Sequence, residues 1–227
     1  MDKSKYDYEE RAKKLEKNDY WGQVRRTVNG KAVGKDQIDL IYNQIKNNLQ
    51  MKRDDNLIDI GCGNGILTNM FKEDVNTIFG IDRSKFLISV AKEKFQSQNI
   101  KYLCGEVPLV LEQIDFNNGF NKVLVYGVFS FFDNKTSNDF FNWASNNSKI
   151  KRIFIGNSRD RSLAHKFYKR SVSESELNDF KSSMGAWRTK EYFSNIANEF
   201  KWKIEFSKMP KEYYSYEYYF DVTLTRD

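Results

Sequence analysis

One short segment of the chain combines glycines and a carboxylate in a spacing suited to binding a nucleotide-like ligand. It runs from Leu57 to Gly65 and reads LIDIGCGNG. The apolar run predicts a buried strand, and the glycines predict a tight turn whose backbone can approach a ligand closely. A second carboxylate, Asp82, follows Gly61 by 21 residues, where it could accept two hydrogen bonds from ribose hydroxyls.

The same segment argues against two other nucleotide-binding motifs. A dinucleotide turn needs a third glycine at its sixth position, where this chain has Ile66, and it has no acid inside the strand, where this chain has Asp59. A P-loop needs Gly-Lys followed by Ser or Thr, which is absent. Either carboxylate alone could simply cap a turn. The pair of Asp59 and Asp82 around a glycine run favours a ligand site.

Strands and helices are expected to alternate around this turn. Apolar runs predict strands at residues 57–60, 77–81, 100–103, 122–126 and 152–155. Helical spacing of apolar residues predicts helices at residues 36–49, 66–71, 84–96, 108–114 and 137–145. This alternation indicates right-handed crossovers and a largely parallel sheet.

The last third of the chain departs from that pattern. Residues 157–187 contain no clear strand and are expected to form a helical insertion on the substrate side. Thr189 is expected to cap a helix, and strands near 203–206 and 216–224 follow as an antiparallel hairpin. The prediction is a single α/β domain over residues 1–227. It has a doubly wound, seven-stranded, mostly parallel sheet with a C-terminal antiparallel strand and helices on both faces.

In these motifs the chain resembles the class I S-adenosylmethionine-dependent methyltransferases. The resemblance covers roughly residues 36–156, and the sheet pattern extends it to the C-terminus. It implies a methyltransferase with S-adenosylmethionine as cofactor and S-adenosylhomocysteine as product. It also implies that the segment from Asp59 to Gly65 wraps the methionine part of the cofactor, and that Asp82 binds the ribose.

The resemblance extends to the turns after the next strands. Gly105 and Glu106 should face the adenine, although the family more often has Asp where Glu106 stands, and Tyr126 and Gly127 should lie beneath the transferring methyl group. The full set of expected cofactor residues is Asp59, Gly61, Cys62, Gly63, Asn64, Gly65, Asp82, Arg83, Gly105, Glu106, Tyr126, Gly127, Trp21 and Arg25.

The polar segment 1–35 is expected to act as a lid over this site. Trp21 would cover the cofactor, and Arg25 or Arg26 would pair with its carboxylate or with an anionic substrate. The alternative is a surface helix whose aromatic residues pack on the sheet.

Methyl transfer to a hydroxyl needs in-line positioning and removal of a proton. His165 is the only histidine and therefore the first candidate for the general base. Asp160 and Tyr126 are the alternatives, and positioning without a base remains a further alternative.

Absent motifs narrow the methyl acceptor. The segment Tyr126-Gly127-Val128-Phe129 lacks the Asn/Asp-Pro-Pro-aromatic turn of enzymes that methylate adenine or glutamine nitrogen, and neither cysteine follows a proline as in cytosine-carbon enzymes. The prediction is a small-molecule acceptor, such as a sugar or natural-product intermediate, with oxygen favoured over nitrogen. The alternatives are an RNA-modifying methyltransferase and a non-catalytic binding protein with this fold.

Composition sets further limits. The net charge is +6, without a block of like charges, so a nucleic-acid partner is not expected. Two cysteines and one histidine give no metal site, and no run approaches the ~20 apolar residues of a membrane span. A cytoplasmic protein with no membrane partner is expected. The oligomeric state is left open.

Overall fold

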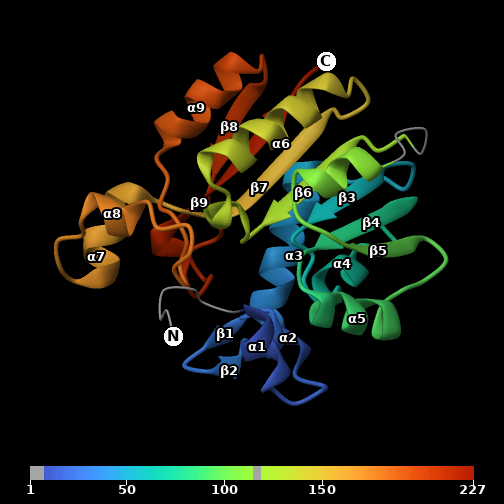
Figure 1. Ribbon diagram of the computed structural model, residues 1–227, viewed down its shortest axis with the longest axis horizontal. Coiled ribbons are helices and arrows are strands. Elements are labelled where there is room, and N and C mark those ends of the chain that lie inside the picture. Colours follow the sequence, from blue (N-terminus) through green and yellow to red (C-terminus); the bar gives the residue numbers. More distant parts are fainter. Residues whose placement is uncertain (1–7, 115–118) are drawn as a thin grey trace.

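The computed structural model describes residues 8–114 and 119–227. Seven strands form one sheet in the order β5-β4-β3-β6-β7-β9-β8 (Figure 1). Their bounds are β3 (Asn56–Ile60), β4 (Thr77–Asp82), β5 (Ile100–Cys104), β6 (Lys122–Tyr126), β7 (Arg152–Arg159), β8 (Lys203–Ser207) and β9 (Tyr219–Thr225).

The sheet has the predicted doubly wound, mostly parallel arrangement. Neighbouring strands from β5 through β7 pair in parallel, and β9 pairs antiparallel with both β7 and β8. The strand order reverses beside β3, which pairs with β4 on one side and with β6 on the other. Open α/β sheets bind ligands at such a switch point, beyond the carboxyl ends of the strands.

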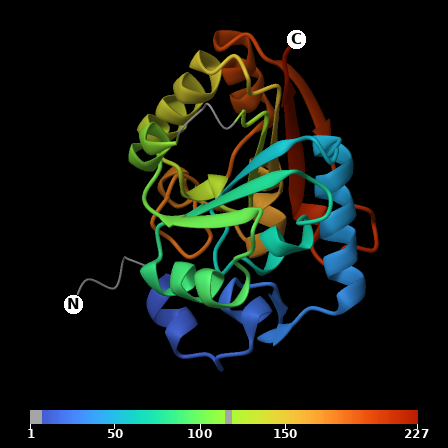
Figure 2. The same ribbon diagram turned by 90° about the vertical axis from the view of Figure 1, so that its right-hand side faces the viewer.

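Helices cover both faces of the sheet, as predicted. On one face Ile41 and Ile45 of α3 and Ile88 of α5 are buried, and on the other Phe141 of α6 and Phe193 of α9 are buried. The two views in Figures 1 and 2 show these helices on opposite sides of the strands. The helices that flank the sheet are α3 (Lys35–Leu49), α4 (Ile66–Met70), α5 (Lys85–Lys94), the short 3-10 helix η1 (Leu109–Gln113), α6 (Asn134–Asn146) and α9 (Lys190–Glu199).

Strand β7 is longer than its apolar run predicts. It ends at Arg159 instead of residue 155, because β9 supplies hydrogen-bonding partners for the polar residues beyond Ile155. The register shifts between Ile155 and Ser158, where Asn157 has a positive φ of 61°. Residues 157–159 therefore belong to the sheet and not to the insertion.

The rest of the insertion is helical in part and has a small core of its own. The core contains Ala164, Leu177 and Trp187, which are buried together. Its helices are η4 (Arg161–Leu163), α7 (Ala164–Tyr168) and α8 (Glu174–Leu177), and two further 3-10 turns lie elsewhere, η3 (Phe129–Phe131) and η5 (Tyr216–Tyr218). Strand β9 begins at Tyr219, later than predicted, because η5 occupies the preceding residues.

The N-terminal elements gather beside α5 at one end of the molecule (Figures 1 and 2). They are α1 (Tyr8–Lys13), α2 (Tyr20–Gln23) and a hairpin of β1 (Thr27–Val28) and β2 (Lys31–Ala32). Asn64 of the glycine turn anchors α2, since its Nδ2 donates to the Tyr20 carbonyl at 2.8 Å and to Gln23 Oε1 at 2.9 Å.

Candidate active site

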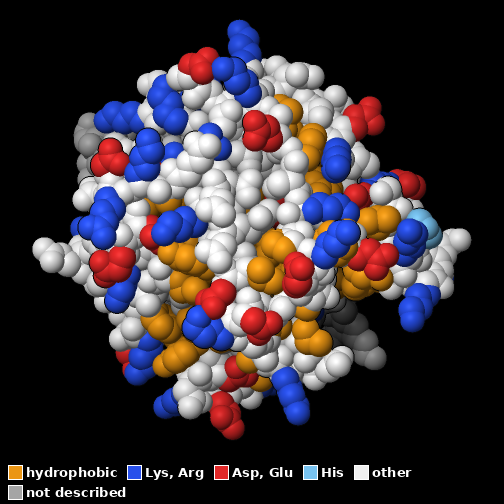
Figure 3. All heavy atoms as spheres, turned by 180° about the vertical axis from the view of Figure 1, so that it is seen from behind, with side chains coloured by type: hydrophobic (Ala, Val, Ile, Leu, Met, Phe, Trp, Pro, Cys, Tyr) orange, Lys and Arg blue, Asp and Glu red, His pale blue; other side chains and the backbone are white. Residues whose placement is uncertain are grey.

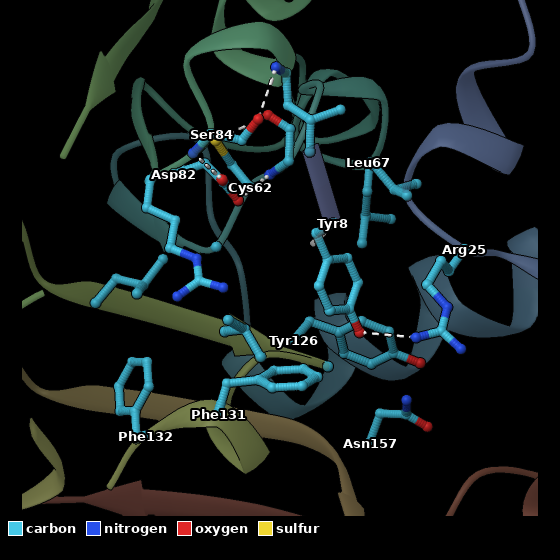
Figure 4. A pocket seen from close by; sticks show the side chains of 18 of the residues that line it. Tyr8, Arg25, Cys62, Leu67, Asp82, Ser84, Tyr126, Phe131, Phe132 and Asn157 are labelled. Carbon is cyan, nitrogen blue, oxygen red and sulfur yellow. Dashed lines mark hydrogen bonds between the residues drawn. The ribbon is translucent and has the colours of Figure 1, made fainter. Parts of the chain in front are cut away.

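A cavity of about 940 Å³ lies at the carboxyl edge of the parallel strands. The N-terminal elements, the turns after β3 to β6, the end of β7 and part of the insertion all line it. Its volume is near the upper end of the roughly 300–1,000 Å³ typical of ligand pockets. Figure 4 shows Asp82, Ser84 and Cys62 at one end of this cavity, with Phe132 and Asn157 at the other.

The glycine turn after β3 forms one wall and requires its glycines. Gly61 and Gly63 have φ angles of 75° and 58°, which side chains rarely adopt. A Cβ on Gly61 would lie 2.7 Å from Val128, and one on Gly63 would lie 2.7 Å from Val24. Backbone is therefore the only part of these residues that can face a ligand.

Asp82 at the end of β4 holds the turn and retains capacity for a ligand. Its carboxylate accepts from the Gly63 amide at 3.0 Å and from the Ser84 amide at 2.8 Å. A carboxylate has about four acceptor sites, so roughly two remain for ligand hydroxyls. Burial raises the pKa of Asp82, while the two backbone donors oppose that shift.

Asp59 lies on β3 at the base of the same turn. Its side chain is 3% exposed, lines the cavity, and accepts a hydrogen bond from Thr68 Oγ1 at 2.6 Å. Burial raises the pKa of Asp59 to about 7, although the Thr68 hydroxyl opposes the shift. A cationic ligand group at this position would favour the ionised form.

Most of the other expected cofactor residues also line the cavity. They are Gly61, Cys62, Gly63, Arg83, Gly105, Glu106, Tyr126, Gly127, Trp21 and Arg25. Asn64 and Gly65 do not, because Asn64 points to α2 and Gly65 packs beneath the ring of Tyr102. These two residues support the turn from behind.

Tyr126 at the end of β6 is stacked against an arginine. The Arg26 guanidinium lies 4.9 Å from the centre of the Tyr126 ring and also borders Gly127. Burial raises the pKa of Tyr126 well above its usual value. A phenol with so high a pKa is a hydrogen-bond donor at neutral pH and a poor general base.

Tyr8 and Arg25 connect the N-terminal elements to the insertion above the cavity. The Tyr8 hydroxyl donates to the Ser183 carbonyl at 3.3 Å, and Arg25 Nη1 donates to the same carbonyl at 2.8 Å. The Tyr8 ring also meets Phe131 edge to face at 5.3 Å (Figure 4). We call this connection the roof. Arg25 thus hydrogen-bonds to protein groups. Sequence analysis did not predict the contact between Tyr8 and Ser183, because the two residues lie far apart in the sequence.

Two of the predicted base candidates, His165 and Asp160, are not among the residues that line the cavity. His165 is exposed on α7, and the pale blue histidine side chain is visible on the molecular surface in Figure 3. Asp160 accepts from the amide and hydroxyl of Ser162 at 3.0 and 2.6 Å and caps η4. A base must come within hydrogen-bond reach of the substrate, and neither residue contributes to the cavity wall. Within the described residues, no group of metal-ligating side chains was found.

The sequence prediction missed the residues at the acceptor end of the cavity. Arg159 ends β7, beyond the predicted strand end at residue 155, and Tyr219 begins β9, inside the strand predicted at residues 216–224. Phe131, Phe132 and Phe180 line the same end. Aromatic enrichment was visible in the sequence, but nothing in it distinguished these rings from core residues.

Fold and site together define a methyltransferase of the Rossmann-like class. A family model described as a methyltransferase domain matches residues 51–215. The chain therefore belongs to this family, the class I S-adenosylmethionine-dependent methyltransferases.

Individual relatives are distant. A probable cobalt-precorrin-6B C(15)-methyltransferase of Methanocaldococcus jannaschii is 31% identical over 75 residues, which is 32% of this chain and 41% of the relative. The match thus spans about two fifths of that relative's length.

Solved structures share the fold. The methyltransferase domain of a bacterial Hen1 has a TM-score of 0.59 at 15% identity, over 84% of this chain and 99% of that domain. Magnesium protoporphyrin IX methyltransferase from Synechocystis PCC 6803, solved with bound S-adenosylhomocysteine, has a TM-score of 0.58 at 15% identity. It matches over 85% of this chain and 83% of its own.

Proposed function

We propose that the chain transfers a methyl group from S-adenosylmethionine to a small-molecule acceptor, with oxygen favoured as the methylated atom. The observation that carries the proposal is the joint placement of the glycine turn, Asp59 and Asp82 at one end of a cavity that continues past them. One end suits the cofactor, and the remaining volume suits a second ligand.

The residues present fit the cofactor. The two spare acceptor sites of Asp82 suit a ribose diol, and Gly61 and Gly63 leave room for a ligand against the backbone. Asp59 offers a buried carboxylate for a cationic amino group. Gly105 and Glu106 line the wall expected to face the adenine.

The bound cofactor supplies an electrophilic methyl group on a sulfonium. The protein contributes positioning, because Tyr126, the last residue of β6, and the following Gly127 line the cavity next to the glycine turn. Orientation of this kind can contribute on the order of 7–11 kcal/mol to lowering a barrier. Because neither His165 nor Asp160 lines the cavity, we propose positioning without a dedicated base, with the proton of the acceptor hydroxyl passing to water.

The roof supports a small acceptor over a polymer. Tyr8 and Arg25 line the cavity and hydrogen-bond to Ser183, so protein contacts bridge the N-terminal elements and the insertion there. On the face shown in Figure 3, basic and acidic side chains are interspersed, whereas an RNA-binding surface is expected to carry a continuous basic stripe. In the described residues no helix is both long and apolar enough to cross a bilayer.

Calorimetry with S-adenosylhomocysteine tests the proposal. The wild-type protein should bind it in the micromolar range, and Asp82→Ala should lower the affinity at least a hundredfold by removing both the ribose acceptor and the support of Gly63. Asp139→Ala is the matched control, because Asp139 pairs with Lys135 on α6 and does not line the cavity. Equal affinities of Asp82→Ala and wild type would refute the proposed cofactor site.

A filter-binding assay separates the acceptor classes. We expect no salt-sensitive RNA binding at physiological ionic strength. Binding that falls steeply with salt would favour the RNA-modifying alternative. Cofactor binding without turnover on any acceptor pool from the cell would favour the non-catalytic alternative.

A further inference from the structure

Arg159, the last residue of β7, lies at the acceptor end of the cavity with an unsatisfied guanidinium. Its side chain is 8% exposed, and both Nε and Nη1 are buried without a hydrogen-bond partner. Among the described residues no carboxylate forms an ion pair with it. A buried cation without a partner is costly, and an anionic group of a ligand would supply the missing partner.

The neighbours of Arg159 hold it in place without neutralising it. Its guanidinium carbon lies 5.7 Å from the centre of the ring of Tyr219, and Tyr219 is paired with Arg159 across the β7–β9 ladder. Arg188 pairs with it through the backbone, since the Arg188 amide donates to the Arg159 carbonyl at 3.0 Å. The Arg188 side chain is itself buried, and its Nη2 donates to the Phe132 carbonyl at 3.0 Å.

The acidic residues on this side are already engaged. Asp133 lines the cavity, but its carboxylate caps α6 by accepting from the Thr136 amide at 2.7 Å. Asp221 is buried and accepts from the Asn157 amide at 2.7 Å and from Gln44 Nε2 at 2.8 Å. Neither carboxylate forms a salt bridge with Arg159.

A second unsatisfied polar atom lies nearby. Asn157, two residues before Arg159, lines the cavity, and its Oδ1 is buried without a partner. The hydrogen bond from its amide to Asp221 fixes its backbone in the positive-φ conformation. Its carboxamide is therefore available to a hydroxyl or amine of a ligand. Figure 4 shows Asn157 beyond Tyr126, away from Asp82 and the cofactor end.

The walls around these groups are flat and apolar. Phe131, Phe132, Phe180, Met184 and Tyr219 line the acceptor end. Aromatic side chains favour stacked or edge contacts with a planar ligand. A guanidinium binds carboxylate or phosphate oxygens in a planar, bidentate geometry.

We propose that the methyl acceptor is a compact planar molecule carrying an oxyanion, a carboxylate or a phosphate, which Arg159 binds, while Asn157 contacts its hydroxyl or amine. This inference rests on the proposed function, because it assigns the second ligand of the same cavity. It adds the chemical class of the acceptor and a specificity-determining residue.

The test uses protein saturated with S-adenosylhomocysteine and three ring probes, which are 4-hydroxybenzoate, phenyl phosphate and the neutral methyl 4-hydroxybenzoate. Calorimetry compares wild type, Arg159→Met and Arg159→Lys. At least one anionic probe should bind wild type. Its affinity should be at least tenfold lower for Arg159→Met and intermediate for Arg159→Lys. The affinity for the neutral methyl ester should be the same for wild type and both variants. The preferred anion then identifies the group as carboxylate or phosphate.

The matched control is Arg161→Met, because Arg161 lies outside the cavity and pairs with Glu174. This control should bind the anionic probes as wild type does. Removing an unpaired buried charge should also raise the melting temperature of ligand-free Arg159→Met by about 2–4 °C.

Three results would overturn the inference. They are no anion binding to the loaded wild type at millimolar concentration, equal anion binding by wild type and Arg159→Met, and a lower melting temperature for Arg159→Met. Failure of S-adenosylhomocysteine itself to bind wild type would instead refute the proposed function.

Discussion

The amide of Gly63 donates to the Asp82 carboxylate across 3.0 Å, so the turn after β3 is fastened to the end of β4 before any ligand is present. The second carboxylate oxygen accepts from Ser84, whose hydroxyl donates to Glu9 of α1 at 2.9 Å. Glycine turn, β4 and the N-terminal elements are therefore linked through a single carboxylate. Preorganisation of this kind reduces the entropy that a ligand must overcome.

Gly63→Ala should weaken S-adenosylhomocysteine binding more than tenfold, because the new methyl group would collide with Val24 and occupy a positive-φ position. Gly30→Ala is the matched control, since Gly30 also has a positive φ of 79° but no atom lies within 4 Å of its Cβ position. Calorimetry on both variants separates the local contact from general backbone strain. Similar losses in the two variants would contradict the steric explanation.

Asp59→Asn should change the pH dependence of stability in a defined direction. The pKa of Asp59 is raised from 3.8 to about 7, so between these values the folded chain retains a proton that the unfolded chain has lost. Wild-type stability from this group therefore falls as pH rises through that window. Between pH 5 and pH 8 the free energy of unfolding of the variant, measured with urea, should rise by on the order of 2 kcal/mol relative to that of wild type.

The comparison with wild type removes the contribution of Asp221, whose pKa burial raises to about 6 in both proteins. Parallel stability profiles for wild type and Asp59→Asn would show that the Asp59 carboxyl does not titrate in this range.

Arg25→Ala should loosen the roof without altering the glycine turn. The variant loses the 2.8 Å hydrogen bond to Ser183, so dissociation of S-adenosylhomocysteine should accelerate roughly tenfold in stopped-flow measurements, and hydrogen exchange should rise around residues 180–185. Tyr8→Phe keeps the ring against Phe131 and should have a smaller effect. Arg170→Ala, which removes a surface pair with Glu176, is the control. Unchanged dissociation in Arg25→Ala would argue against a closing role.

His165→Ala should leave turnover within about twofold of wild type, because the imidazole is exposed on α7 and outside the cavity. The measurement is steady-state methyl transfer to whichever acceptor is identified, with cofactor affinity as a control for folding. A tenfold loss of turnover with intact cofactor affinity would restore His165 as a base and require α7 to move.

The sequence was most informative where structure is local. The run KVLVY predicts β6 at residues 122–126, as observed. Parallel pairing of β3 with β4 brings the ends of those two strands together, so that Asp59 and Asp82 both line the cavity. The glycine turn is equally local, because its conformation depends on the absence of Cβ atoms. Residue type and spacing carry that information directly.

Local sequence patterns do not predict contacts between segments that are distant in the chain. Tyr8 and Ser183 are 175 residues apart, and no periodicity links them. The extension of β7 to Arg159 depends on pairing with Tyr219, which the polar residues beyond Ile155 do not signal. His165 was selected for its chemistry alone, and chemistry does not specify where a side chain points.

The roof has a kinetic consequence for the cycle. Ser183 accepts hydrogen bonds from Tyr8 and Arg25, while Asn64, behind the glycine turn, secures α2. We expect parting of this bridge to be coupled to the release of spent cofactor, as the Arg25→Ala experiment tests. The timing of turnover would then depend on contacts between segments that are about 160 to 175 residues apart in the sequence.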